Sequence, residues 1–138
     1  MKTLKIFCAL YFCCAAFISI AQRGKALTES DYYFLKTVAI PEDIKLEVGG
    51  LAPLADGRLA VSTRRGEIWM IENPYMLNGT QPHYQLYAEG LHEVLGLAYK
   101  DGSLYCTQRG ELTKMTDTDG DGRADVFEPI YRFDLSGN

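Results

Sequence analysis

The chain has 138 residues, of which 47% are hydrophobic and 23% are charged, and its formal net charge is −4. This length suits one ordinary domain, and the composition excludes an intrinsically disordered tail and a charge-rich helical array. The acidic balance argues against nucleic acid as the main partner. Thirteen glycines and nine tyrosines favour an all-β fold with tight turns.

Residues 1–21 have the pattern of an export signal. Lys2 and Lys5 precede the apolar run Ile6–Ile20, and Ser19-Ile20-Ala21 provides the small residues of a cleavage site. A run of about 15 apolar residues is shorter than the ~20 that a membrane-spanning helix needs. The segment predicts a cleaved signal peptide and a periplasmic or extracellular protein; an uncleaved anchor is the alternative.

Cleavage of the signal would leave Cys106 as the single cysteine of the mature chain. Such a protein has no internal disulfide, even in an oxidising compartment. Cys106 shares a strand face with Leu104, so we expect it to be a small buried hydrophobic residue. The alternative is a reactive thiol.

A repeat of about 45 residues dominates the rest of the chain. Asp56-Gly57 and Asp101-Gly102 lie 45 residues apart, and the Arg-Gly-Glu triplets that begin at Arg65 and Arg109 lie 44 apart. Each unit alternates short apolar runs with tight-turn pairs, which predicts four strands per unit. The expected strands are 51–55, 58–63, 67–72 and 84–87 in the first unit, and 94–99, 103–107, 111–116 and 126–133 in the second.

Four antiparallel strands every 40–45 residues are typical of a β-propeller blade. We expect an N-terminal lead at 22–50, with an alternating strand at 44–48, and an incomplete β-propeller at 51–138, with blades at about 51–90 and 91–134. A small antiparallel sandwich is the alternative. A propeller closes with about four to eight blades. Two blades therefore predict either part of a longer protein or a partial propeller that associates with another chain.

The strongest chemical motif is the acidic stretch from Asp117 to Glu128, which fits the calcium-loop pattern D-x-[DN]-x-[DN]-G-x5-E. Two carboxylates ~5 Å apart repel by roughly 3 kcal/mol at an effective dielectric of about 20, so a bound cation would stabilise the folded loop. Oxygen ligands in a flexible loop favour Ca²⁺, and Gly122 permits the bend. The expected ligands are the side chains of Asp117, Asp119, Asp121 and Asp125 and the backbone carbonyl of Arg123.

The segments on both sides of this loop have the pattern of strands, not of the helices of an EF-hand. We therefore expect a calcium loop in a β-hairpin, with a structural role for the ion. Glu128, at the twelfth position, is an open candidate for a further ligand. A solvated acidic turn without metal is the alternative.

Two shorter motifs carry weaker signals. His92 and Glu93 precede the strand expected at 94–99, where loops line one mouth of a propeller, so both could face a ligand; a surface position is the alternative. Asn78-Gly79-Thr80 fits the acceptor pattern for N-glycosylation, but an Asn-Gly pair between strands favours a turn.

The stretch LHEVLGLAYKDGSLY at Leu91–Tyr105, followed by the acidic stretch Thr116–Asp125, resembles the soluble quinoprotein glucose/sorbosone dehydrogenase family. Pro41–Ile71 resembles the first blade of its secreted bacterial relatives, which carry a DTDGDGRAD-type loop. The resemblance covers roughly residues 31–138. It implies a six-bladed propeller that, in true dehydrogenases, holds pyrroloquinoline quinone with calcium.

In that family a histidine removes a proton from a sugar hydroxyl while the quinone accepts the hydride. This histidine and the arginines that hold the quinone lie on later blades and have no counterpart in residues 1–138, so no catalytic or quinone-binding residue is assigned. We expect the N-terminal part of an exported sugar or alcohol dehydrogenase-like propeller, catalytically incomplete alone. The second hypothesis is a non-catalytic secreted propeller module that binds glycan or protein partners.

Overall fold

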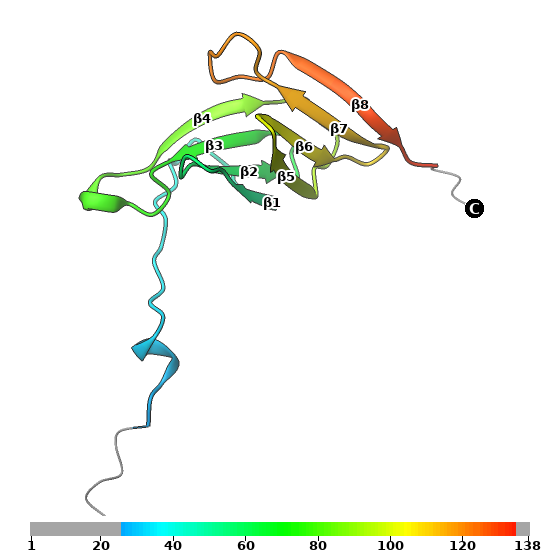
Figure 1. Cartoon of the computed structure of the whole chain (residues 1–138). Coiled ribbons are helices and arrows are strands. Elements are labelled where there is room, and N and C mark those ends of the chain that lie inside the picture. The colour runs from blue at the N-terminus through cyan, green and yellow to red at the C-terminus, as the bar shows by residue number, and fades with distance from the viewer. Residues whose placement is uncertain (1–25, 135–138) are drawn as a thin grey trace, which may run out of the picture. The chain divides into compact units, whose positions relative to one another are not determined.

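The computed structural model describes residues 26–134 (Figure 1). The predicted signal peptide at 1–21 lies outside the described residues. The chain divides into two compact units, the first ending at Lys36 and the second beginning at Thr37. The described part of the first unit has one 3-10 helix, η1 (Glu29–Asp31), which Thr28 caps through hydrogen bonds from its backbone N and its hydroxyl to Asp31 Oδ2.

No helix within residues 26–134 has both the length and the apolar character required to cross a membrane.

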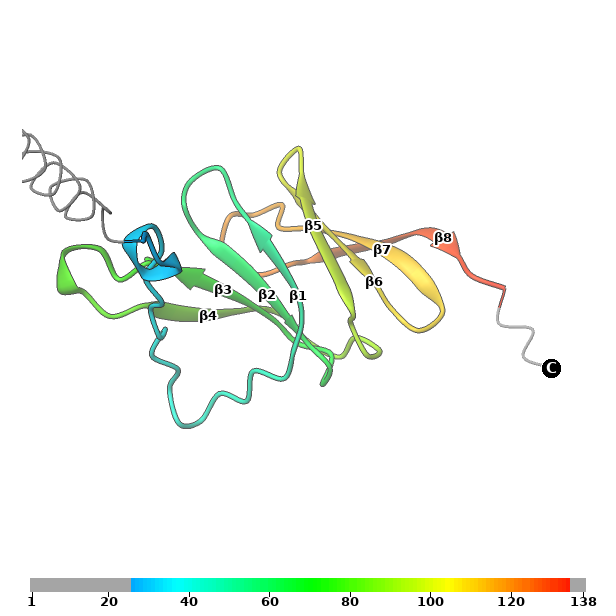
Figure 2. The ribbon, with the colours of Figure 1, turned by 90° about the horizontal axis from the view of Figure 1, so that it is seen from below.

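Between residues 37 and 134 the second unit contains eight strands in two antiparallel four-stranded sheets (Figures 1 and 2). The first sheet consists of β1 (Val48–Pro53), β2 (Leu59–Thr63), β3 (Ile68–Glu72) and β4 (His83–Ala88), in that order. The second consists of β5 (Gly96–Lys100), β6 (Ser103–Thr107), β7 (Glu111–Thr116) and β8 (Val126–Arg132). A short 3-10 helix, η2 (Leu77–Gly79), lies between β3 and β4. The expected all-β class and all eight expected strands of the repeat are therefore confirmed.

The two sheets share the same irregularity. Between the third and fourth strands the pairing register shifts at Ile68/Trp69 in the first sheet and at Leu112/Thr113 in the second, 44 residues later. The shift leaves Tyr87 on β4 and Ile130 on β8 as the extra residues of a β-bulge. The sequence repeat is therefore a structural repeat, with the same strand order, pairing direction and bulge.

The two sheets pack on each other through one face each and share one buried core. Strands β1 and β5 lie side by side at this contact (Figure 2). A Cβ added to Gly49 would lie 2.0 Å from the carbonyl oxygen of Val94, and one added to Gly50 would lie 2.9 Å from the backbone N of Leu97. Glycine at these two positions allows the backbones to approach this closely.

The prediction of a strand at 44–48 is wrong except for its last residue. Val48 begins β1, whereas residues 44–47 precede the sheet. The amide of Ile44 donates to the carbonyl of Pro41, and that of Glu47 donates to the carbonyl of Lys45, each at 3.1 Å. These amides are used in local turns and are not available to a neighbouring strand. The first sheet thus starts at residue 48, inside the lead expected at 22–50.

Candidate functional site

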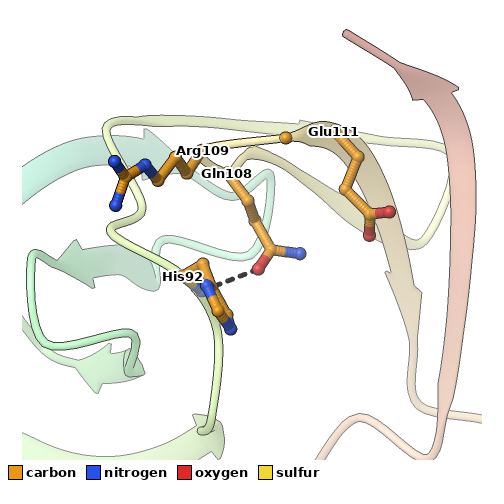
Figure 3. A pocket seen from close by; sticks show the side chains of 5 residues that line it. His92, Gln108, Arg109 and Glu111 are labelled. Atoms are coloured by element: carbon orange, nitrogen blue, oxygen red, sulfur yellow. Dashed lines mark hydrogen bonds between the residues drawn. The ribbon is translucent and has the colours of Figure 1, made fainter. Parts of the chain in front are cut away.

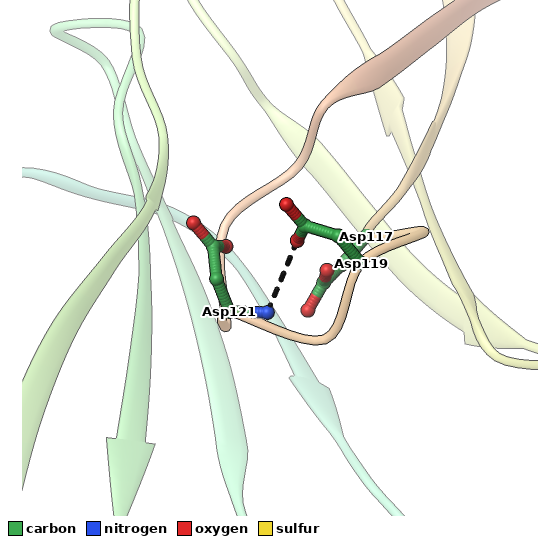
Figure 4. Close-up of side chains that lie close together, drawn as sticks. All are labelled: Asp117, Asp119 and Asp121. Atoms are coloured by element: carbon green, nitrogen blue, oxygen red, sulfur yellow. Dashed lines mark hydrogen bonds between the residues drawn. The ribbon is translucent and has the colours of Figure 1, made fainter.

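The acidic loop at 117–125 connects β7 to β8, so it lies in a β-hairpin as expected (Figure 4). Asp117 is half-buried, whereas Asp119 and Asp121 are exposed. One carboxylate oxygen of each of these three residues lies within 4.8 Å of those of the other two. The fold therefore brings together three of the four carboxylates expected to bind metal.

Hydrogen bonds from the loop backbone hold these carboxylates. Asp117 accepts from the amides of Gly120 at 2.7 Å and Gly122 at 2.9 Å. Asp119 accepts from the amide of Asp121 at 3.2 Å, and Asp121 accepts from the amide of Arg123 at 2.7 Å. Since a carboxylate has about four lone-pair sites, each of the three retains capacity for a further ligand.

Asp125 ties the two ends of the loop together. Its carboxylate accepts hydrogen bonds from the hydroxyl and from the backbone amide of Thr118. The hydrogen bond from the Thr118 hydroxyl is the main reason that the pKa of the Asp125 carboxyl is lowered from its usual value. The structure therefore places Asp125 at the base of the loop, outside the group of three carboxylates.

Arg123, whose backbone carbonyl is an expected ligand, and Glu128, the open candidate, each form an ion pair through the side chain. The guanidinium of Arg123 contacts Glu89 at 3.2 Å, and the Glu128 carboxylate accepts from the Lys114 ammonium at 2.9 Å across β7 and β8. Water reaches both ion pairs and screens their charges, so neither contributes much to stability. Glu128 lies on the sheet and not among the loop carboxylates.

Contacts with β4 position the loop against the first sheet. Gln85 Nε2 donates to the carbonyl of Asp121 at 3.0 Å, and the amide of Ala124 donates to the carbonyl of Tyr87 at 2.8 Å. Burial, and then the negative charges of Asp117 and Asp125, raise the pKa of Tyr87 to about 12. Sequence reasoning missed these contacts because β4 and the loop lie more than 30 residues apart, and no local pattern connects them.

A second polar site lies where β6 turns into β7 (Figure 3). An open cavity of about 380 Å³ is lined by His92, Gln108, Arg109, Gly110 and Glu111. The backbone amide of His92 donates to Gln108 Oε1 at 2.7 Å, and the amide of Arg109 donates to the carbonyl of His92 at 3.1 Å. The expected ligand-facing position of His92 is thus compatible with the structure, whereas Glu93 lies outside the lining residues.

Cys106 is fully buried in the core, as expected for a small hydrophobic residue. Burial, with a smaller effect from the charge of Glu111, raises the pKa of the Cys106 thiol to about 12. The thiol is therefore protonated at neutral pH and is a poor nucleophile.

The chemistry of the loop fits a hard cation, because its three grouped side chains all offer carboxylate oxygens.

No protein-family model, curated protein or solved structure matches this chain.

Proposed function

We propose that this chain forms two blades of an exported β-propeller of the glucose/sorbosone dehydrogenase-like, quinoprotein type, with a structural calcium loop. The observation that carries the proposal is the structural repeat, in which two four-stranded sheets have the same order and the same bulge 44 residues apart. Stacked sheets of four antiparallel strands are the units of a propeller. The remaining blades would lie outside residues 1–138, and the protein would act in the periplasm or outside the cell.

The calcium ion would be held by Asp117, Asp119 and Asp121, with the carbonyl of Arg123 and the Asp125 carboxylate as the further expected ligands. Its positive charge would offset the repulsion among the grouped carboxylates. Because Gln85 and Tyr87 bind the same loop, a stiffer loop would also stabilise its contact with β4. The ion would therefore strengthen the packing of the two sheets.

Thermal unfolding in Ca²⁺ or in EDTA tests the calcium loop. We expect roughly 5 mM Ca²⁺, which exceeds the typical Kd of extracellular calcium modules, to raise Tm. Asp119→Ala should abolish the rise, and Asp43→Ala, which removes an exposed carboxylate outside the loop, should leave it unchanged. Equal Tm values of the unaltered protein in Ca²⁺ and EDTA would contradict the proposal.

The oxidoreductase activity would need residues from the other blades. A complete site requires a histidine that acts as general base and basic residues that bind pyrroloquinoline quinone, and none is assigned in this chain. The DNA that follows the codon of Asn138 provides the direct test. A reading frame that encodes further blades with such a histidine would support a dehydrogenase, and blades without it would support a binding module.

The second candidate function is a non-catalytic module that binds glycan or protein. The observation that favours it is the open cavity beside His92, where the side chains of Arg109 and Glu111 offer a donor and an acceptor. A heteronuclear NMR titration with mono- and oligosaccharides would test it. Shifts confined to this cavity and lost in Arg109→Ala, but retained in the exposed control Arg65→Ala, would support this function.

A further inference from the structure

The sequence contains one Asn-Gly pair, Asn78-Gly79, and the fold leaves it in the loop that connects β3 to β4. This loop projects past the ends of the two strands (Figure 1). Asn78, Gly79 and the following Thr80 are all exposed. Within residues 26–134 the side-chain amide of Asn78 has no hydrogen-bond partner. The pair is therefore open to water and takes no part in the calcium loop or in the cavity beside His92.

An Asn-Gly pair can change chemically with water as its only co-reactant. The backbone nitrogen of the glycine attacks Cγ of the asparagine, and a new C–N bond closes a succinimide ring. The side-chain amide leaves as ammonia, which takes up the proton that the attacking nitrogen loses. Water then breaks one of the two bonds from the ring nitrogen to a carbonyl carbon, which gives aspartate or isoaspartate. Glycine favours the first step because it has no Cβ to obstruct the attack.

Asn73, earlier in the same loop, cannot follow this route. Residue 74 is proline, whose backbone nitrogen has no proton to lose. The side chain of Asn73 is also fully engaged: its Oδ1 accepts from the amide of Leu77 at 2.8 Å, and its Nδ2 donates to the carbonyl of Thr80 at 3.0 Å. One asparagine of the loop is thus exposed and reactive, while the other holds the loop together.

The closed loop keeps the reacting atoms of Asn78 and Gly79 apart. The ψ angle of Asn78 is 20°, which places the Gly79 nitrogen close to the backbone nitrogen of Asn78 and away from its Cβ. Ring closure therefore requires rotation about the Cα–C bond of Asn78. This rotation would displace Thr80, whose amide donates to the carbonyl of Leu77 at 3.2 Å and whose carbonyl binds Asn73. The reaction must accordingly proceed from an opened loop.

Backbone strain in the same loop favours opening. Asn73, Met76 and Asn78 have φ angles of 49°, 49° and 56°. These angles lie in the left-handed region, which is unfavourable for residues other than glycine. The hydrogen bonds of the Asn73 side chain oppose this strain, so they determine how often the loop opens.

We propose that Asn78 is a site of spontaneous deamidation and that the side chain of Asn73 controls its rate by holding the loop closed. The reaction replaces a neutral amide by a carboxylate, so it adds negative charge to the β3–β4 connection. The isoaspartate product also inserts a methylene group into the backbone. This inference goes beyond the proposed function and depends neither on the propeller arrangement nor on the calcium loop.

Incubation of the purified protein at neutral pH and physiological temperature, in water enriched in the heavy isotope of oxygen, tests the proposal. The label enters the new carboxylate, so it separates deamidation during incubation from any that precedes it. The tryptic peptide Gly66–Lys100 contains both asparagines of the loop, and fragmentation in the mass spectrometer distinguishes them. We expect label at residue 78, as aspartate and isoaspartate, and none at residue 73.

Variants of Asn73 test its control of the rate. Asn73→Ala should speed deamidation of Asn78 by roughly fivefold or more, the effect of losing a hydrogen bond of ordinary strength. Asn73→Asp keeps the acceptor for the Leu77 amide and lacks the donor to Thr80, so its rate should be intermediate. Gln81→Ala, at an exposed neighbouring residue, should react like the unaltered protein. Far-ultraviolet circular dichroism verifies that each variant is folded.

The unaltered protein unfolded in urea gives the rate of the open chain. The folded protein should react about five to a hundred times more slowly, as one to three hydrogen bonds would produce. Equal rates in the folded and unfolded protein would overturn the proposal. So would absence of label at Asn78 in both the folded protein and Asn73→Ala, or equal rates in Asn73→Ala, Asn73→Asp and Gln81→Ala.

Discussion

The side chain of Gln85 on β4 donates a hydrogen bond from Nε2 to the backbone carbonyl of Asp121 in the β7–β8 loop, at 3.0 Å. The same amide nitrogen lies 2.2 Å from the position that a Cβ on Gly122 would occupy. The acidic loop is thus held by the first sheet as well as by its own hairpin, and glycine at 122 leaves the space for this contact.

Replacing Gly122 by alanine should destabilise the protein more than replacing Gly120. Both glycines have left-handed backbone conformations, with φ of +87° and +80°, which cost another residue about 1–2 kcal/mol. A Cβ at Gly120 meets nothing within 4 Å, so we expect Gly120→Ala to lower the free energy of unfolding by about 1 kcal/mol and Gly122→Ala by roughly 2–3 kcal/mol. Urea unfolding measures both.

The same two glycine substitutions are then compared in a protein that also carries Gln85→Ala. Truncation of Gln85 removes the atoms that the new methyl group would meet, so the difference between the two glycine variants should vanish in that background. A difference that persists would show that Gln85 does not crowd the loop.

Gly66 should tolerate substitution far less than Gly57, although both lie in turns of the first sheet. Their φ values are similar, +85° and +89°. A Cβ on Gly66 would lie 1.8 Å from the carbonyl oxygen of Leu91, whereas one on Gly57 meets nothing within 4 Å. We expect a loss of about 1 kcal/mol for Gly57→Ala and of about 3 kcal/mol or more for Gly66→Ala. Similar urea midpoints for the two variants would contradict this close approach.

The sequence predicted the strands because both signals, the alternation of apolar and polar residues and the Asp-Gly turns, depend on residues close together in the chain. The expected ends of the strands at 103–107 and 111–116 agree with β6 and β7. The same alternation failed at 44–48, since a pattern of side chains does not reveal whether a partner strand is present. There the amides of Ile44 and Glu47 bond to nearby carbonyls instead.

The acidic site likewise has one part that the local sequence predicted and another part that it did not. Spacing of two residues was enough to predict that Asp117, Asp119 and Asp121 would converge. The bond between Asp125 and Thr118 is local, yet sequence could not separate it from a ligand role, because the same carboxylate oxygens serve both. The contacts of Gln85 and Tyr87 depend on how the sheets pack, which no pattern in either strand encodes.

The stability of the protein should fall as pH rises from about 9 toward 12. Burial raises the pKa of Cys106 from about 9.0 to about 12 and that of Tyr87 from about 10.0 to about 12. The unfolded chain therefore loses these protons at lower pH than the folded protein, and the free energy of unfolding decreases as the unfolded state ionises. Urea unfolding at several pH values measures this slope.

Cys106→Val isolates the contribution of the thiol. Valine is the residue at the equivalent position 61, so the core should accept it, and the decline of stability with pH should become shallower. An unchanged slope in this variant would mean that the thiol ionises equally in both states.

Tyr84→Phe should loosen the lead segment from the first sheet. The Tyr84 hydroxyl donates to the carbonyl of Ala39 at 2.9 Å, and loss of one such bond costs about 1 kcal/mol. Tyr105→Phe is the matched control, because within residues 26–134 its hydroxyl has no hydrogen-bond partner. We expect Tyr84→Phe, and not the control, to lower the urea midpoint and to speed amide hydrogen exchange in residues 37–47. Equal exchange in the two variants would show that this bond does not hold the lead, whose attachment would then depend on burial of Ile44, which is 8% exposed.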